Sequence, residues 1–193
     1  MREKIQKLLL STKRDGMKTL LVWMDLNGFY SSPCSTQHHL CKKGGLAEHS
    51  WNVFDVMDKL AGTMLGEKEH DEIINSIIIC SLLHDIGKAG QFGKCGYVEN
   101  YLSKKDKNGN PIRSEAKPYV SNSDLLNVPH EIRSLAIISK YINLTEDEQH
   151  AILYHNGKYT HMGYDLKETP LQMLLHFADL WCSRVTEVEQ QPE

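Results

Sequence analysis

The segment Ile77-Ile-Ile-Cys-Ser-Leu-Leu-His-Asp-Ile-Gly-Lys88 decides how this chain can fold and what it can bind. Apolar residues fill it as far as Leu83, which predicts a buried element. His84 and Asp85 then place an imidazole beside a carboxylate at the end of that element. Such groups persist in a protein interior mainly when they are paired or bind a metal ion. The His84-Asp85 pair is therefore the first candidate for a metal site.

Two more potential ligands lie far from this pair in the sequence. His49 occurs in Gly44-Gly-Leu-Ala-Glu-His-Ser50, and Asp179 occurs in Leu175-His-Phe-Ala-Asp-Leu180. Each of them alone is more simply explained as a hydrogen-bonded core or surface residue. Taken together with the His-Asp pair, they supply the mixed nitrogen and oxygen ligands that suit a divalent cation.

Apolar residues that recur every three or four positions predict a mainly helical protein. We expect N-terminal helices within 1–30, a helix at 46–64 and a helix at 130–141. Another is expected to end near His84, one to begin with a capping box at Thr145, and the last to begin at Pro170. Periodicity alone leaves the isoleucine-rich segment open between strand and helix, and its neighbours favour a helix. Gly87 is expected to end that helix directly after the His-Asp pair.

One region, residues 88–129, lacks a helical period and is predicted to be an irregular insert. Asn108-Gly109 lies there between two apolar runs, which indicates a two-residue hairpin turn. The 193 residues predict one domain over 1–193, with a frayed tail at 189–193. The predicted fold class is all-α, a helical bundle with a small β-hairpin insert between the His-Asp pair and the following helix.

Composition narrows the environment and the partners. The chain has 22 lysines and arginines and 25 acidic residues, which gives a net charge of −3. There is therefore no excess of basic residues that would favour binding to duplex nucleic acid. The longest apolar stretch is far shorter than the roughly 20 residues that span a bilayer, and the N-terminal segment is charged, unlike a signal peptide. The five cysteines form no Cys-x-x-Cys pair, which favours free thiols and a cytoplasmic location. The ligand set also lacks the thiolates of closed structural zinc sites.

Four short motifs together resemble those of the HD-domain phosphohydrolases, a helical superfamily of metal-dependent enzymes that cleave phosphate esters. They are Gly44–Ser50, Leu83–Lys88, Pro129–Ser134 and Leu175–Leu180, and the resemblance extends from about Met17 to Val185. It includes small HD proteins of bacteria and phages and the HD domain of certain 3′-to-5′ exoribonucleases. The resemblance implies an HD-domain helical bundle in which one metal ion is held by His49, His84, Asp85 and Asp179.

The resemblance also implies a second metal ion, because members with two ions add histidines before the final aspartate. His130 and His155 stand in the matching motifs, and Asp85 has two oxygens with which to bridge. The alternatives are a helix-start residue for His130 and a helix-end cation for His155. One or two ions of Mn, Fe, Co, Ni or Zn are expected, because nitrogen ligands favour these metals over Mg or Ca.

Three cationic side chains are candidates for binding the substrate. Lys88 follows the His-Asp pair closely enough to stabilise a phosphate, and we expect Asp85 and Lys88 to be the catalytic residues. Arg133 offers a fork of donors for two oxygens. His39 matches the position of substrate-contacting histidines in the resembling family. The alternatives are an exposed lysine for Lys88, an ion pair with Glu131 for Arg133, and a solvated loop histidine for His39.

The sequence therefore predicts a metal-dependent phosphohydrolase that uses a metal-bound hydroxide. The expected reaction is that of a phosphodiesterase on a nucleotide, a cyclic nucleotide or an oligonucleotide, and the insert is expected to select among them. The expected partner is this phosphate-containing substrate, with no membrane and no duplex nucleic acid. The alternative is a nucleotide-binding sensor module that keeps the metal but does no chemistry.

Overall fold

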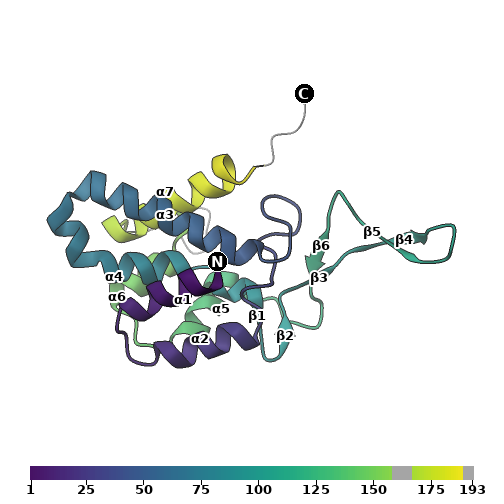
Figure 1. The fold of residues 1–193 in the computed structure, drawn as a ribbon, viewed down its shortest axis with the longest axis horizontal. Helices are drawn as coiled ribbons and strands as arrows, with labels where there is room; N and C mark the ends of the chain where they lie inside the picture. Colours follow the sequence, from purple (N-terminus) through teal and green to yellow (C-terminus); the bar gives the residue numbers. More distant parts are fainter. Residues whose placement is uncertain (158–166, 189–193) are drawn as a thin grey trace.

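The computed structural model describes residues 1–157 and 167–188, a range in which helices predominate (Figure 1). The α-helices of this range are α1 (Arg2–Ser11), α2 (Met17–Leu26), α3 (Gly45–Leu65), α4 (Glu67–Leu83), α5 (His130–Ile138), α6 (Glu146–Leu153) and α7 (Pro170–Trp181). A 3₁₀ turn, η1 (Ile86–Ala89), follows α4, and a π turn, η3 (Cys182–Thr186), follows α7. The predicted tail at 189–193 lies outside the described residues.

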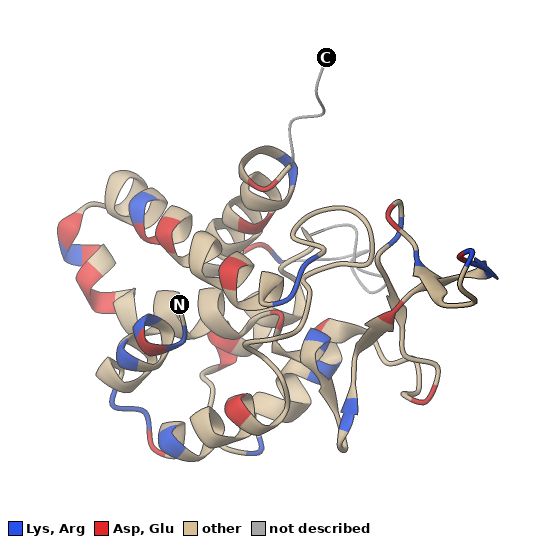
Figure 2. Cartoon of the chain, turned by 45° about the vertical axis from the view of Figure 1, so that its right-hand side comes forward, with Lys and Arg blue, Asp and Glu red and all other residues tan. Residues whose placement is uncertain are grey.

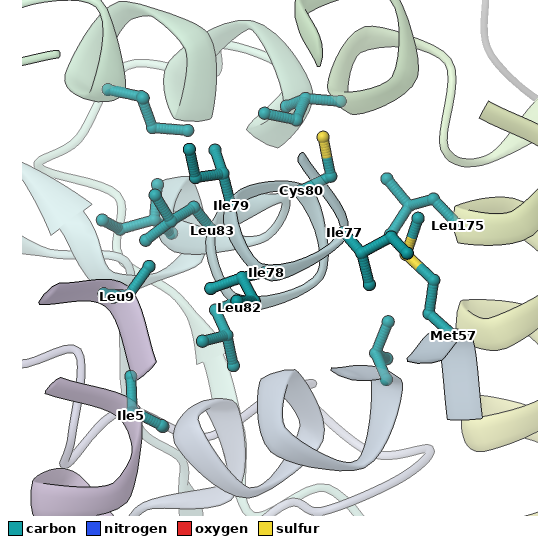
Figure 3. Close-up of a cluster of buried hydrophobic side chains, with 14 of the residues drawn as sticks. Ile5, Leu9, Met57, Ile77, Ile78, Ile79, Cys80, Leu82, Leu83 and Leu175 are labelled. Carbon is teal, nitrogen blue, oxygen red and sulfur yellow. The ribbon is translucent and has the colours of Figure 1, made fainter. Parts of the chain in front are cut away.

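The C-terminal half of helix α4 lies at the centre of the hydrophobic core, whereas its N-terminal half is mostly exposed. Every residue from Ile77 to Leu83 is buried, and α4 contacts α1, α3, α6 and α7. Figure 3 shows side chains pointing from all sides of α4 toward Leu9 of α1, Met57 of α3 and Leu175 of α7. A helix that is covered on all sides is apolar all round. The helical prediction for this segment is confirmed, and burial explains why its apolar residues form a continuous run.

Gly87 has a different role from the one predicted. Helix α4 ends at Leu83, and Gly87 lies inside the turn η1 that follows. A Cβ at this position would lie 2.4 Å from the backbone oxygen of His130 and 2.8 Å from the nitrogen of Ser134. The glycine therefore permits α5 to pack against η1. Its own N–H donates to the Ser134 hydroxyl at 2.9 Å.

The capping box that was predicted for α6 is confirmed. The Thr145 hydroxyl accepts a hydrogen bond from the Glu148 N–H, and the Glu148 carboxylate accepts one from the Thr145 N–H. Glu148 is also fully buried, where its carboxylate accepts two hydrogen bonds from Arg14 and one from Ser76. One acidic residue thus caps α6 and joins it to α4 and to the α1–α2 loop.

The all-α prediction is wrong, because the insert contains β-structure beyond one hairpin. Within the described residues its strands form three two-stranded antiparallel sheets: β1 (Gly90–Gln91) with β2 (Lys94–Cys95), β3 (Tyr97–Glu99) with β6 (Tyr119–Ser121), and β4 (Tyr101–Lys105) with β5 (Pro111–Arg113). The predicted hairpin exists as β4–β5, but its turn is longer than the two residues predicted, because Lys105 pairs with Pro111 and residues 106–110 connect the strands. Gly109 within this connection has a φ of 84°. These strands are two to five residues long and their side chains are mostly exposed. They therefore lack the alternation of apolar and polar residues by which a strand is recognised in a sequence.

The β4–β5 hairpin projects away from the helices as an arm (Figure 1). Every residue of β4 is exposed. Figure 2 shows basic residues near the tip of the arm, where Lys104, Lys105 and Lys107 lie, with Asp106 among them. Elsewhere basic and acidic residues are interspersed over the helices. In the part of the chain that the structure describes, no helix has the length and apolarity that crossing a membrane requires.

Candidate metal centre

The six predicted metal ligands come together at the ends and inner faces of five helices. His49 lies in α3, His84 is the C-cap of α4 with Asp85 next to it, His130 is the first residue of α5, His155 follows α6, and Asp179 lies in α7. All are buried except His130 and Asp179, which are partly exposed. Residues that span 131 positions of the sequence, from His49 to Asp179, therefore meet in one place.

Asp85 is the centre of this cluster, and its two carboxylate oxygens face different histidines. Oδ2 lies 3.6 Å from Nε2 of His49 and 3.5 Å from Nε2 of His84. Oδ1 lies 3.2 Å from Nε2 of His130 and 3.7 Å from Nε2 of His155. A carboxylate in this position can serve two cations, one on each oxygen.

Two groups of ligand atoms are compact enough to hold an ion. His49, His84 and Asp179 each offer an atom within 4.8 Å of the others, and so do His84, Asp85 and His155. Asp179 approaches through Oδ1, which lies 3.1 Å from Nε2 of His49. The described residues thus contain a buried histidine and aspartate cluster that can bind metal.

Local backbone geometry sets which nitrogen of each histidine faces the cluster. Nδ1 of His84 lies 2.9 Å from the carbonyl oxygen of Ser81, and Nδ1 of His155 lies 2.8 Å from that of Ile152. A carbonyl oxygen can only accept, so each Nδ1 carries the proton. When neutral, each ring therefore presents the lone pair of Nε2 to the cluster, which is the form that binds a metal ion.

Several buried atoms of the cluster lack hydrogen-bond partners, which tests whether a cation fits there. Among the described residues, Nε2 of His49, Nε2 of His84 and Oδ1 of Asp85 have no such partner. Asp179 lies near His49 Nε2, but in a geometry that does not make a hydrogen bond. Buried polar atoms without partners are costly, and divalent cations bound in the cluster would satisfy all three. The residues present therefore fit a metal ion.

The charge states of the ligands are also suitable. Burial raises the pKa of Asp85, but Lys88 and His84 outweigh it and hold that pKa well below its usual value. The pKa of Asp179 is likewise lowered, because His49 outweighs the effect of burial. Burial, reinforced by the charge of His84, lowers the pKa of His155 to about 4. At neutral pH the carboxylates are therefore ionised and His155 is neutral.

Lys88 lies at the edge of the cluster and lines two hollows. Its Nζ donates a hydrogen bond to Oδ2 of Asp85 at 2.6 Å. Burial lowers the pKa of Lys88, but the attraction of Asp85 outweighs it and raises that pKa, so the ammonium stays charged. Lys88 and His130 line both hollows, one of about 640 Å³ against the insert and one of about 490 Å³ beside α7 and η3. Both hollows therefore border the cluster.

The two other predicted substrate residues have contacts of their own. Arg133 is buried and donates to Oε1 of Gln91 at 3.0 Å and to the carbonyl oxygen of Leu126 at 2.8 Å, so it ties the insert to α5. It also lines the larger hollow. His39 lines the smaller hollow, and its ring centroid lies 5.2 Å from that of His49. Substrate binding by either residue stays a prediction.

Two residues beside His49, Glu187 and Cys34, belong to no predicted site. Glu187 places a carboxylate oxygen 2.9 Å from Nδ1 of His49. Cys34 forms a third compact group with His39 and His49, and its Sγ lies 3.2 Å from Nε2 of His39. Burial raises the pKa of Cys34, but the charges of Lys88 and His49 outweigh it and lower the pKa to about 6. Neither residue belongs to a short motif, so spacing gave no signal for them.

Comparisons with known proteins add no family to this description. No protein-family model, no curated protein and no solved structure matches the chain.

Proposed function

We propose that the protein is a metal-dependent phosphohydrolase of the HD-domain type that acts as a phosphodiesterase. The observation that carries the proposal is the position of Asp85, whose two oxygens face two separate sets of histidines. Two cations about 3.5 to 4 Å apart are the arrangement that suits displacement at phosphorus. A carboxylate between two histidine pairs is the residue that such an arrangement requires.

The proposal divides the ligands between two ions. His49, His84 and Asp179 would hold one ion together with Oδ2 of Asp85, and His130 and His155 would hold the other with Oδ1. When bound, a divalent ion supplies a Lewis acid that offsets charge on phosphoryl oxygens and acidifies water. Imidazole ligands favour Mn, Fe, Co, Ni or Zn for this role.

Lys88 would contribute the fixed charge that a phosphate requires. Its ammonium is largely enclosed, with 16% of the side chain exposed, and it lines both hollows. A charge that is already in place costs no reorganisation when negative charge develops on the phosphoryl oxygens. Lys88 would therefore orient the phosphate and stabilise the transition state, while Asp85 holds the ammonium in position.

The two hollows favour a phosphodiester over a phosphomonoester. A monoester has an organic group on one side of phosphorus and needs one hollow, whereas a diester places groups on both sides. The larger hollow is lined by Lys88, His130 and Arg133, and no described carboxylate lines it. This lining suits an anionic substrate such as a nucleotide, a cyclic nucleotide or an oligonucleotide.

Metal analysis followed by a substrate panel tests the proposal. The purified protein is stripped of metal, and each of Mn, Fe, Co, Ni and Zn is restored before incubation with bis-p-nitrophenyl phosphate, p-nitrophenyl phosphate, cyclic nucleotides and short oligonucleotides. We expect metal-dependent cleavage of diesters that Asp85→Asn abolishes while circular dichroism stays unchanged. Asp106→Asn, on the exposed arm, is the matched control and should retain activity.

Two outcomes would contradict the proposal. One is hydrolysis by Asp85→Asn at the wild-type rate. The other is nucleotide binding without hydrolysis under every metal, which would identify a sensor module.

A further inference from the structure

We propose that Glu187 is a positioning residue that fixes the proton of His49 on Nδ1 and so directs Nε2 toward the metal. The inference rests on the proposed metal site and extends it to a residue outside every recognised motif. Besides His49, the Glu187 carboxylate comes near His39, whose Nε2 lies 3.9 Å from Oε2, but His39 is not one of the six predicted ligands. Glu187 would act on the metal only through His49.

The ring of His49 lies between two carboxylates that come from one C-terminal segment. Oε2 and Oε1 of Glu187 lie 2.9 and 3.1 Å from Nδ1, and Oδ1 of Asp179 lies 3.1 Å from Nε2. An ionised carboxylate only accepts hydrogen bonds. The Nδ1 proton of His49 therefore donates to Glu187, and when the ring is neutral its Nε2 lone pair faces Asp85 and Asp179.

Glu187 is itself held in place from the helix that carries His49. The side-chain amide of Asn52 donates to Oε1 of Glu187 at 2.9 Å. Asn52 lies three residues after His49 in α3, so both side chains project from the same face of the helix. The carboxylate of Glu187 is 1% exposed, and a buried carboxylate requires such partners. Its orientation is therefore determined by two donors from one helix.

A change in helical geometry brings Glu187 to this position. The turn η3 (Cys182–Thr186) is a π turn, closed by a hydrogen bond of 2.9 Å from the Glu187 N–H to the carbonyl oxygen of Cys182. Turns of this kind inside helices occur frequently at functional sites. Here η3 packs against α3, which places Glu187 beside Nδ1 of His49. Asp179 lies on the other side of the same ring, beside Nε2.

The partner of His49 differs from those of the other buried histidines. His84 and His155 donate through Nδ1 to neutral backbone carbonyls, whereas His49 donates to a carboxylate. A charged acceptor makes a stronger hydrogen bond and increases the electron density that the ring offers to a metal. Glu187 should therefore affect both the orientation of His49 and its strength as a ligand.

Metal affinity and histidine tautomers in the same set of variants test the inference. Zn²⁺ affinity is measured by competition with a chromophoric chelator for the wild type, Glu187→Ala, Glu187→Gln and Asn52→Ala. Nitrogen-15 spectra of the histidines, with His49 assigned through His49→Gln, report which ring nitrogen carries the proton. Glu48→Gln is the matched control, because it removes an acid next to His49 in the sequence that pairs with Lys42 at the surface.

We expect Glu187→Ala to lose about 10- to 100-fold in Zn²⁺ affinity, the usual range for a residue that orients a ligand. Glu187→Gln keeps an acceptor oxygen and should lose less, and Asn52→Ala should fall between Gln and wild type. The His49 proton should leave Nδ1 in part of the Glu187→Ala molecules. Glu48→Gln should match the wild type in both measurements.

Two results would overturn the inference, and they have different meanings. Wild-type Zn²⁺ affinity with an unchanged tautomer in Glu187→Ala and Glu187→Gln would overturn the role of Glu187 alone. Failure of the wild type to bind any metal would overturn the proposed function and the inference with it. If Glu187→Ala does not fold, Glu187→Gln and Asn52→Ala decide by the same criteria.

Discussion

Lys88 donates its hydrogen bond to Oδ2 of Asp85, which is the same oxygen that faces His49 and His84. The ammonium therefore shares an anionic oxygen with the atoms that would hold a metal ion. A fixed positive charge near this oxygen disfavours a second cation, but it also favours a phosphate anion. Lys88 should thus affect metal binding and turnover in opposite directions.

Replacement of Lys88 by methionine separates these two effects. Lys88→Met should bind Zn²⁺ or Mn²⁺ at least as tightly as the wild type, because a competing charge is removed. Turnover of a diester should fall about 10²- to 10³-fold, the usual effect of losing one group that stabilises transition-state charge. Chelator competition and steady-state kinetics measure the two quantities. Lys104→Met on the exposed strand β4 is the control, and equal losses of turnover in both variants would contradict the prediction.

Metal binding should stabilise the folded protein through Asp85. A ligand that binds only the folded state at about 100 times its Kd adds about 2.7 kcal/mol to the free energy of unfolding. The wild type should therefore show a higher Tm with Zn²⁺ or Mn²⁺ than after chelation. Asp85→Asn removes the charge shared by both sets of histidines, so its Tm should not respond to metal. A metal-dependent rise of Tm in Asp85→Asn equal to that of the wild type would exclude Asp85 as the central ligand.

The helical core and the six ligands were predictable because their signals are local. The apolar run in α4, the capping box at Thr145 and the Asn108-Gly109 turn each depend on residues close together in sequence. Five of the six candidate ligands lie within one of the four short motifs, and His155 lies at the end of the helix that the capping box opens. Their convergence could be expected only through the family resemblance, since spacing alone does not place α3 beside α7.

Other features depend on contacts between distant residues and left no local pattern. Glu187 meets His49 across 138 positions, and Arg133 reaches Gln91 across 42. The exposed strands of the insert are held by pairing with each other, so their side chains need not alternate. Gly87 was misinterpreted for the same reason, because the backbone that approaches it belongs to α5.

The close approach at Gly87 predicts a strong effect of one added methyl group. In Gly87→Ala the Cβ would meet backbone atoms of α5, which cannot move aside like a side chain. Overpacking of this kind costs about 1 to 3 kcal/mol of unfolding free energy. Helix α5 should shift and carry His130 away from Asp85, so the affinity for a second metal ion should fall more than that for the first. Urea denaturation and metal titration measure these effects.

Gly62→Ala provides the control for Gly87, because a Cβ there meets no atom within 4 Å. Gly62 lies inside α3, where alanine is favoured over glycine. This variant should be as stable as the wild type or more stable. Equal stability of the Gly62 and Gly87 variants would show that α5 can adjust without cost.

Glu148 should be one of the most sensitive residues outside the metal cluster. Its buried carboxylate accepts hydrogen bonds from Arg14, Ser76 and the backbone of Thr145. Removing one partner of a buried ion pair costs about 3 to 5 kcal/mol, because the other charge is left uncompensated. Glu148→Ala should lose this much unfolding free energy in urea denaturation. Glu146→Ala, an exposed acid in the same helical turn, should change stability little, and a similar loss in both variants would contradict the argument.

The contact between His70 and Asp58 predicts how stability depends on pH. Nε2 of His70 in α4 lies 2.8 Å from a carboxylate oxygen of Asp58 in α3, and this hydrogen bond raises the pKa of His70 above 6.5. A raised pKa stabilises the fold fully below the unfolded-state value and loses this effect as pH rises through the folded-state value. The pair is partly exposed, so the contribution is about 0.2 to 1 kcal/mol. Urea denaturation at about pH 5.5 and about pH 9 should show that His70→Gln destabilises the protein only at the lower pH. In an Asp58→Asn background most of this pH-dependent difference should disappear, leaving the smaller contribution of Asp71, whose Oδ1 lies 3.4 Å from Nδ1 of His70. An undiminished difference there would assign it to another group.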